Sequence, residues 1–280
     1  MILDPHDKVL IDGHLVEIGE GIAKSFSEGD RLLATPSSGL LLVPKAELDL
    51  VGSCVDDALH AFSVLSKVDD AQIANFYSSF AKRLEDDEIF SRIRMANDRD
   101  VVAATAAGRS TTRLVLSDAM RQDMIDAVHI WETLATSSAA RETVSHDGWS
   151  IESHIAPLGV VGFVFEGRPN VFADATGVLR SRNVCVFRIG SDAFDTAQAI
   201  MNLAVIPSLA DAGLPNGSVV LLPSKTHACA WALFSDRRLS LAVARGSGSS
   251  VALLGEIAQQ HGIPASLHGT GGAWMVVSTV

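Results

Sequence analysis

The chain has 280 residues, enough for one large domain or two smaller ones, and 48% of them are hydrophobic. A mean hydropathy of +0.26 predicts a well-filled core. The low aromatic share of 6% favours α/β layers over a β-sandwich. The formal net charge of −11 argues against binding to nucleic acid, which requires a basic surface.

The cysteines and the N-terminal residues indicate the cellular compartment. Cys54, Cys185 and Cys229 form no CxxC pattern, which is typical of reduced thiols in the cytoplasm. The first residues show no basic stretch followed by an apolar one, so we expect no signal peptide. No apolar run reaches the ~18 residues of a membrane span. We therefore expect a cytoplasmic protein that does not bind membranes.

Residues 1–48 predict a β-rich lead of two hairpins, Val9–Val16 and Arg31–Val43. In residues 49–147 the apolar side chains change to helical spacing. The many charged residues in this segment are interpreted as lying on the solvent-exposed faces of the predicted helices. The expected helices are one through Val55–Leu65, one through Ile73–Leu84 capped by Asp69 or Asp70, Phe90–Ala107 ended by Gly108, and Asp118–Leu134 capped by Ser117.

Residues 148–156 alternate apolar and polar side chains, which predicts a half-exposed strand. From Pro157 onward short apolar runs alternate with helical segments, a pattern typical of a parallel sheet covered on both faces. We therefore predict an α/β fold with a Rossmann-like sheet over residues 157–280. The expected strands are Val160–Phe165, Val184–Phe187, Ser218–Leu222, Leu239–Val243 and Ala265–Leu267. The expected helices are Val171–Leu179, Ala193–Ala212, Thr226–Phe234 and Ser249–His261.

Two neighbouring predicted strands are each followed by a corner that contains glycine and arginine. The first corner holds Gly167 and Arg168, and the second runs from Arg188 to Asp192. Ligands usually bind at the carboxyl ends of parallel strands, so both corners are candidate binding sites. Arg188 and Ser191 suit a ribose or a phosphate. The alternative is a surface arginine beside a serine helix cap.

Two further groups could carry chemistry. The Asn170 amide could donate a hydrogen bond to an oxyanion, or it could simply cap the helix that follows. The turn at Gly246 and Ser247 opens a predicted helix, so its backbone N–H groups could hold a phosphate. An ordinary Ser/Gly helix cap is the alternative, because the turn matches neither GxGxxG nor a Walker A loop.

The histidines have no metal-ligand spacing, so no metal site is expected. The three cysteines fall in predicted strands or helices and are interpreted as structural. His154, His227, His261 and His268 are too irregularly spaced to act together as metal ligands.

The segment 157–170, PLGVVGFVFEGRPN, together with RIGSDA at 188–193, resembles the aldehyde dehydrogenase superfamily. The branch it looks most like is γ-glutamyl phosphate reductase (glutamate-5-semialdehyde dehydrogenase). AGLP at 212–215 and LIDGHLV at 10–16 are similar to further patterns of that family. The resemblance covers nearly the whole chain and is specific between Pro157 and Ala193.

The resemblance implies a domain that binds NADP or NAD without GxGxxG. It implies that the backbone of Phe165 and Glu166 lines the nicotinamide. Arg188, Gly190 and Ser191 would face the adenosine ribose, with Arg188 the candidate cation for a 2′-phosphate. Gly246 and Ser247 would face the pyrophosphate, and Asn170 would be the oxyanion donor. The strand at Trp149–Ile155 would be the first of an arm used to form homo-oligomers.

Two departures from the family pattern matter. His268 stands where the family has a glutamate, although a histidine can act as a base near neutral pH. The family's catalytic cysteine would fall beyond Val280. We expect the coenzyme-binding part of a dehydrogenase that acts on an aldehyde or an activated acyl substrate. The alternatives are a degenerate module that binds a protein partner, and a fragment of a longer protein.

Overall fold

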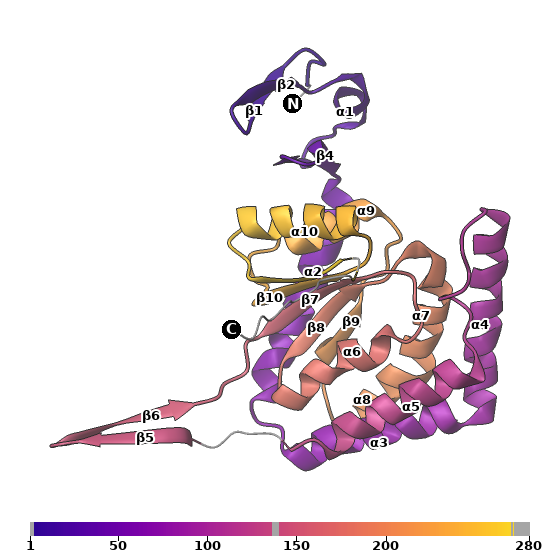
Figure 1. Cartoon of the computed structure of the whole chain (residues 1–280), viewed down its shortest axis with the longest axis vertical. Helices are drawn as coiled ribbons and strands as arrows, with labels where there is room; N and C mark the ends of the chain where they lie inside the picture. Colours follow the sequence, from indigo (N-terminus) through magenta and orange to yellow (C-terminus); the bar gives the residue numbers. More distant parts are fainter. Residues whose placement is uncertain (1–2, 136–139, 270, 272–280) are drawn as a thin grey trace, which may run out of the picture.

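The computed structural model describes residues 3–135, 140–269 and 271. Its centre is a parallel five-stranded sheet in the order β11-β10-β7-β8-β9 (Figure 1). The predicted α/β fold class is confirmed. The strands are β7 (Val160–Phe165), β8 (Val184–Arg188), β9 (Val219–Leu221), β10 (Leu241–Arg245) and β11 (Ala265–His268).

Strand β7, which comes first in the sequence among these five strands, lies in the middle of the sheet. All residues of β7 and β8 are buried, as expected for parallel strands that are covered on both faces. The chain proceeds from β7 to β8 and β9 on one side, and then to β10 and β11 on the other. The order therefore reverses beside β7, and such a switch point is where α/β sheets bind ligands.

Helices cover both faces of the sheet (Figure 1). One face carries α6 (Val171–Gly177), α7 (Phe194–Ile200) and α8 (Ile206–Asp211). The other face carries α2 (Lys45–Leu65), α9 (His227–Phe234) and α10 (Gly248–Gln260). The core lies in these two layers.

The long helix predicted over Ala193–Ala212 is interrupted. A 3₁₀ turn at Ser191–Ala193 precedes α7, and a π-helical turn at Met201–Val205 separates α7 from α8. Pro207 stands at the start of α8. Proline cannot donate the backbone hydrogen bond that would continue a regular helix, which explains the break.

The helical segment forms a further layer outside α6, α7 and α8. It consists of α3 (Asp70–Glu85), α4 (Asp87–Ala106) and α5 (Asp118–Thr133). The predicted caps are present: Asp69 forms a capping box with Gln72, and Ser117 accepts a hydrogen bond from the Met120 N–H. Gly108 ends α4 with φ of +68°, a conformation that favours glycine.

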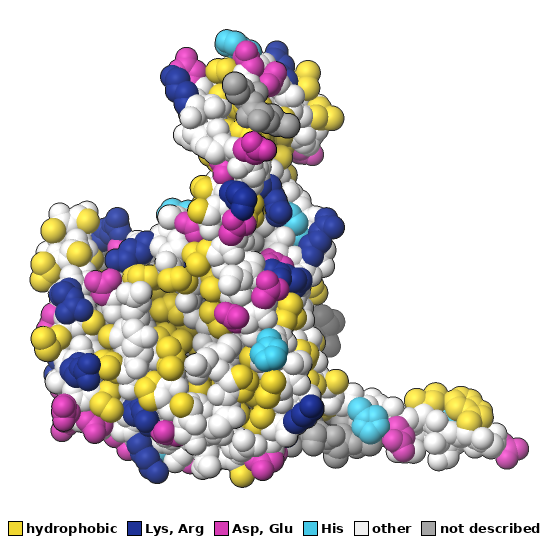
Figure 2. Space-filling view, turned by 180° about the vertical axis from the view of Figure 1, so that it is seen from behind, with side chains coloured by type: hydrophobic (Ala, Val, Ile, Leu, Met, Phe, Trp, Pro, Cys, Tyr) yellow, Lys and Arg dark blue, Asp and Glu magenta, His cyan; other side chains and the backbone are white. Residues whose placement is uncertain are grey.

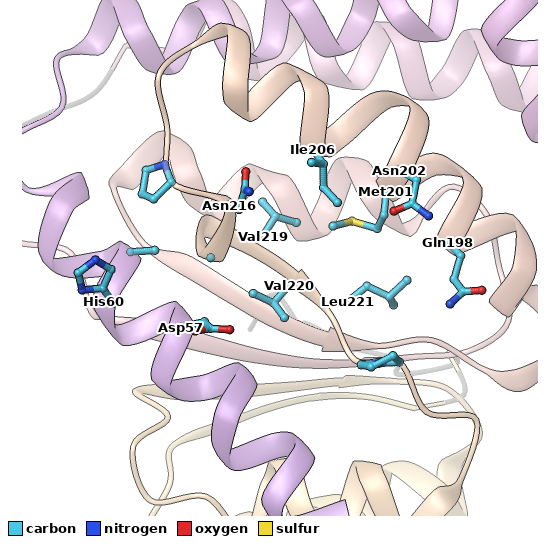
Figure 3. Close-up of a pocket in the computed structure, with 14 residues that line it drawn as sticks. Asp57, His60, Gln198, Met201, Asn202, Ile206, Asn216, Val219, Val220 and Leu221 are labelled. Atoms are coloured by element: carbon cyan, nitrogen blue, oxygen red, sulfur yellow. The ribbon is translucent and has the colours of Figure 1, made fainter.

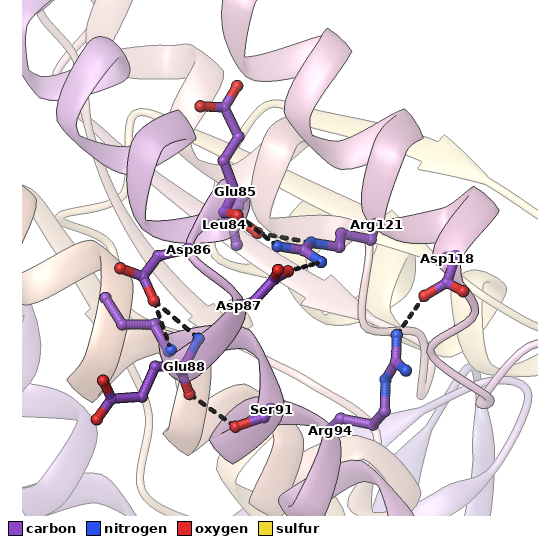
Figure 4. A network of polar contacts seen from close by, with 10 residues as sticks. Leu84, Glu85, Asp86, Asp87, Glu88, Ser91, Arg94, Asp118 and Arg121 are labelled. Atoms are coloured by element: carbon purple, nitrogen blue, oxygen red, sulfur yellow. Dashed lines mark hydrogen bonds and ion pairs between the residues drawn. The ribbon is translucent and has the colours of Figure 1, made fainter.

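Charged side chains join the ends of these helices rather than only facing solvent (Figure 4). Arg121 on α5 donates from Nε to the Leu84 carbonyl oxygen at 2.8 Å and from Nη2 to that of Glu85 at 2.6 Å. Its Nη1 also contacts Asp87 at 2.8 Å. Arg121 therefore satisfies carbonyl groups at the end of α3, which the helix itself leaves without partners.

The N-terminal lead contains the two expected antiparallel hairpins. They are β1 (Lys8–Ile11) with β2 (His14–Glu17), and β3 (Arg31–Thr35) with β4 (Gly39–Val43). A short helix that was not expected, α1 (Glu20–Ser25), lies between them. The first long helix, α2, begins at Lys45, four residues before the predicted boundary at 49.

A two-stranded antiparallel ribbon, the arm, extends away from the body (Figure 1). It pairs β5 (Ala140–His146) with β6 (Trp149–His154), and β6 is exposed rather than half-exposed. Trp149–His154 therefore form the second strand of the arm, not the first as expected. In the described residues, no helix is long and apolar enough to cross a membrane.

Candidate functional site

The corners that follow β7 and β8 stand against each other. A Cβ atom added to Gly190 would lie 2.5 Å from the Gly167 backbone nitrogen and 3.1 Å from the Glu166 carbonyl carbon. Only glycine permits this approach. The parallel register, with Val164 opposite Arg188, brings both corners to one edge of the sheet. The structure therefore juxtaposes the two corners that the sequence singled out.

Phe165 and Glu166 form the first corner. The buried Phe165 ring stacks on Phe163, which fixes the end of β7. The Glu166 N–H donates to the Arg245 carbonyl oxygen at 3.0 Å, so this corner is also tied to β10. The Glu166 carboxylate forms ion pairs with Arg168 and, at 3.6 Å, with Arg113.

Asn170 begins α6 at the same edge and is partly exposed. Its side chain forms no cap to that helix. In the described part of the chain it makes no hydrogen bond at all, which leaves the amide available to a ligand. On the next turn of α6, Asp174 forms an ion pair with Arg245 at the end of β10.

Arg188 lies inside the molecule. Only 5% of the residue is exposed, and Nη2 donates to the Lys225 carbonyl oxygen at 2.9 Å. Burial lowers the pKa of Arg188, while Cys229 and Glu47 oppose that shift. Its neighbour Ser191 is partly exposed at the second corner. The guanidinium therefore supports the loop before α9, beneath the edge where the sequence analysis expected a ribose.

Gly246 and Ser247 form the third corner, at the start of α10. Ser247 is the N-cap of α10 and accepts a hydrogen bond from the Ser250 N–H at 3.4 Å. A Cβ atom on Gly246 would meet nothing within 4 Å, so the space above this glycine is open. A helix N-terminus with open space and small residues fits a phosphate group, and in this respect the corner suits a dinucleotide.

His268 ends the edge strand β11. Its carbonyl oxygen accepts a hydrogen bond from the Gly246 N–H at 3.2 Å, and its Nε2 lies 3.1 Å from the Ser266 Oγ. Two strand spacings separate β11 from β7, about 10 Å. His268 therefore adjoins the third corner and stands apart from the first one, where Asn170 lies.

None of the three cysteines is suited to be a nucleophile. Burial raises the pKa of Cys185 and of Cys229 to about 12, and the Glu47 carboxylate adds to the shift of Cys229. Burial also raises the pKa of Cys54. The thiolate is the reactive form, so burial lowers the reactivity of these thiols near neutral pH. Among the described residues no group of three His, Cys, Asp or Glu side chains could hold a metal ion.

The loop between α4 and α5, which was not predicted to belong to the site, lies over the first two corners. Arg109 in this loop forms an ion pair with Asp192 and lies 3.5 Å from the Ser191 Oγ. The loop is held by Asn97, which donates to the Leu114 carbonyl oxygen at 2.9 Å and accepts from the Leu116 N–H at 2.8 Å. Asn97 was the sequence signal for this loop, because it is a polar residue on the otherwise largely apolar face of a predicted helix.

A separate apolar cavity of about 560 Å³ lies beside the edge strand β9 (Figure 3). Val219, Val220 and Leu221 line it from the strand, and Asp57 and His60 from α2. The cavity lies at the β9 side of the sheet. It is away from the third corner, which follows β10, since β7 and β8 lie between β9 and β10.

No protein-family model matches this chain. A γ-glutamyl phosphate reductase from Afipia carboxidovorans is 35% identical over 169 residues, which cover 58% of this chain and 39% of that protein. The crystal structure of γ-glutamyl phosphate reductase from Thermotoga maritima has a TM-score of 0.73 with 26% identity, covering 80% of this chain and 54% of that one.

The γ-glutamyl phosphate reductase structure from Saccharomyces cerevisiae has a TM-score of 0.68 with 23% identity, and thus shows a shared fold. It covers 79% of this chain and 56% of the yeast chain. This chain therefore spans between 39% and 56% of the length of these three relatives.

The contact between the first two corners predicts the effect of one methyl group. Gly190→Ala should lower the free energy of unfolding by roughly 1–3 kcal/mol, because the methyl group overlaps the Gly167 backbone. Gly246→Ala is the matched control, since its methyl group enters open space. Urea denaturation followed by circular dichroism measures both. Equal losses would contradict the close approach.

The raised thiol pKa values predict the reactivity of the cysteines. At pH 8 Cys185 and Cys229 of the folded chain should resist iodoacetamide, because both thiols remain protonated and enclosed. All three cysteines should react after unfolding in urea, which supplies the control. Mass spectrometry counts the modified thiols. Rapid modification of Cys185 or Cys229 in the folded chain would identify a reactive thiol and contradict this assignment.

Proposed function

This chain belongs to the aldehyde dehydrogenase superfamily, and from that premise we propose that it is the part of an oxidoreductase that binds NAD or NADP. The proposed reaction interconverts an aldehyde with an acid or with an activated acyl group, such as an acyl phosphate or a thioester. The observation that carries the proposal is the contact between Gly190 and Gly167, beside the serine-capped start of α10. The proposed cellular location of the protein is the cytoplasm.

The three corners have distinct roles in the proposed site. Ser247 and Gly246 hold the pyrophosphate at the N-terminus of α10, where the helix dipole favours negative charge. The backbone of Phe165 and Glu166 lines the nicotinamide side. Gly190 and Ser191 adjoin the adenosine ribose, and Arg188 supports this region from below. When bound, the coenzyme supplies or accepts a hydride.

Asn170 and His268 are the proposed catalytic groups of this chain. The Asn170 amide donates to the oxyanion that forms at the carbonyl carbon of the substrate, and such a donor can contribute about 3 kcal/mol to catalysis. His268 is proposed to accept a proton from water or to give one to a leaving group. The nucleophilic thiol of this chemistry is proposed to come from residues outside this chain.

A second candidate is a catalytically inactive module that binds a protein partner. Two features favour it: burial raises the pKa of all three thiols, and His268 stands where the resemblance implies a glutamate. The two candidates differ in one property, because an inactive partner module has no need to bind a nicotinamide coenzyme. Coenzyme binding is therefore the measurement that separates them.

The arm supplies the proposed contact with a second copy of the chain. Val144 pairs with Ile151 and His146 with Trp149, so these four side chains share one face of the ribbon. Trp149 and Ile151 are more than half exposed, and hydrophobic side chains gather towards the far end of the arm (Figure 2). A lone two-stranded ribbon is marginally stable, so this apolar face is expected to pack against a partner chain.

Titration with NADPH and with NADH, followed by nicotinamide fluorescence, tests coenzyme binding. Ser247→Asp should weaken both coenzymes at least tenfold, because a carboxylate would face the pyrophosphate. Aspartate remains a good N-cap, so the free energy of unfolding should stay unchanged. Absence of binding to the wild-type chain would reject the proposed function and favour the partner module.

Sedimentation velocity tests the arm. Ile151→Glu should shift the chain towards the monomer, because it places a charge on the apolar face of the ribbon. Ser150→Glu is the matched control, since Ser150 pairs with Ser145 on the polar face. A wild-type chain that is monomeric at every concentration, or equal behaviour of both variants, would contradict assembly through the arm.

A further inference from the structure

We propose that Arg109 and Asp192 together determine whether the second corner accepts a coenzyme with or without a 2′-phosphate. The inference rests on the proposed coenzyme binding and deepens it. It assigns the discriminating cation to the loop of the helical segment, and not to the sheet residue Arg188.

Asp192 occupies the place from which dinucleotide-binding folds read the ribose. It follows the second strand of the crossover unit that begins with β7. In such folds an acidic residue at the end of the second strand accepts a hydrogen bond from the ribose 2′-hydroxyl, and a nearby arginine accommodates a 2′-phosphate. The Asp192 Cβ atom lies 3.4 Å from the position of a Cβ on Gly167, so its side chain stands beside the contact of the two corners.

Arg109 is an accessible arginine that contacts the second corner. It forms an ion pair with Asp192 through Nη1, and 54% of its side chain is exposed. Within the described residues, the side-chain hydrogen bonds and the ion pair of Arg109 all use Nη1, so Nε and Nη2 can bind a phosphate in the bidentate manner of arginine. Arg188, by contrast, is enclosed and donates to the Lys225 carbonyl oxygen.

The loop holds Arg109 in a defined position. Gly108 turns the chain at the end of α4, and the Arg109 N–H donates to the Ala104 carbonyl oxygen at 2.9 Å. Asp100 on α4 accepts hydrogen bonds from the Thr196 N–H at 2.7 Å and the Thr196 hydroxyl at 2.6 Å. The start of α7 and the arginine loop are thus fixed to the same helix.

The two residues predict opposite shifts in coenzyme preference. In Arg109→Ala, Asp192 remains without its cation and repels a 2′-phosphate, so NADPH should bind at least tenfold more weakly while NADH changes less than twofold. In Asp192→Asn, the ribose 2′-hydroxyl loses a charged acceptor, so NADH should weaken several-fold while NADPH binds as well as before or more tightly. Arg109→Lys should restore part of the NADPH affinity.

Isothermal titration calorimetry with the whole chain measures these affinities for NADPH, NADH, adenosine 2′,5′-bisphosphate and 5′-AMP. The two adenosine nucleotides report on the ribose corner alone. Arg188→Ala is the comparison variant, and circular dichroism verifies that each variant is folded. We expect Arg188→Ala to weaken all four ligands alike.

Three outcomes would overturn the inference while coenzyme binding itself stands. They are equal losses of NADPH and NADH in Arg109→Ala, unchanged affinities in that variant, and a loss confined to the 2′-phosphorylated ligands in Arg188→Ala. A wild-type chain that binds none of the four ligands would reject the proposed function, and this inference with it.

Discussion

The contact between Gly190 and the backbone of Glu166 and Gly167 is the constraint on which the rest of the site depends. Because neither glycine carries a side chain, the ends of β7 and β8 can turn against each other instead of diverging. The turn after β8 then leads directly into the 3₁₀ turn and α7, and it places Ser191 and Asp192 beside the first corner. The same sheet edge includes the Arg245 carbonyl oxygen, which holds the Glu166 N–H.

The helical segment contributes to this edge through two buried polar residues of α4. Asn97 satisfies backbone groups of the loop after α4, and Asp100 caps the start of α7. Buried polar groups are costly unless hydrogen-bonded, and these are bonded to separate segments of the chain. Burial raises the pKa of Asp100 above its ordinary value, although its bonds to Thr196 oppose that shift. Hydrogen bonds from buried polar side chains thus hold the helical layer and the sheet edge together.

Much of this architecture follows from local patterns in the sequence. Buried parallel strands appear as apolar runs, so all five sheet strands were predicted, and caps such as Asp69 and Ser117 marked the helix starts. Strand β5 was missed because its sequence, ARETVSH, has few apolar residues. The π-helical break before α8 was missed although Pro207 marks it. The Arg109–Asp192 ion pair joins residues 83 positions apart, and no local pattern reveals such a contact.

Strand β9 ends the sheet on one side, between Pro215 and Pro223, and it is only three residues long. An open strand beside an apolar cavity is a template on which further strands could add, and long edges of this kind lead to fibrous aggregates. Proline cannot donate to a strand ladder, so the two prolines limit any addition to the short stretch between them. The brevity of β9 therefore protects a highly hydrophobic chain against polymerisation from this side.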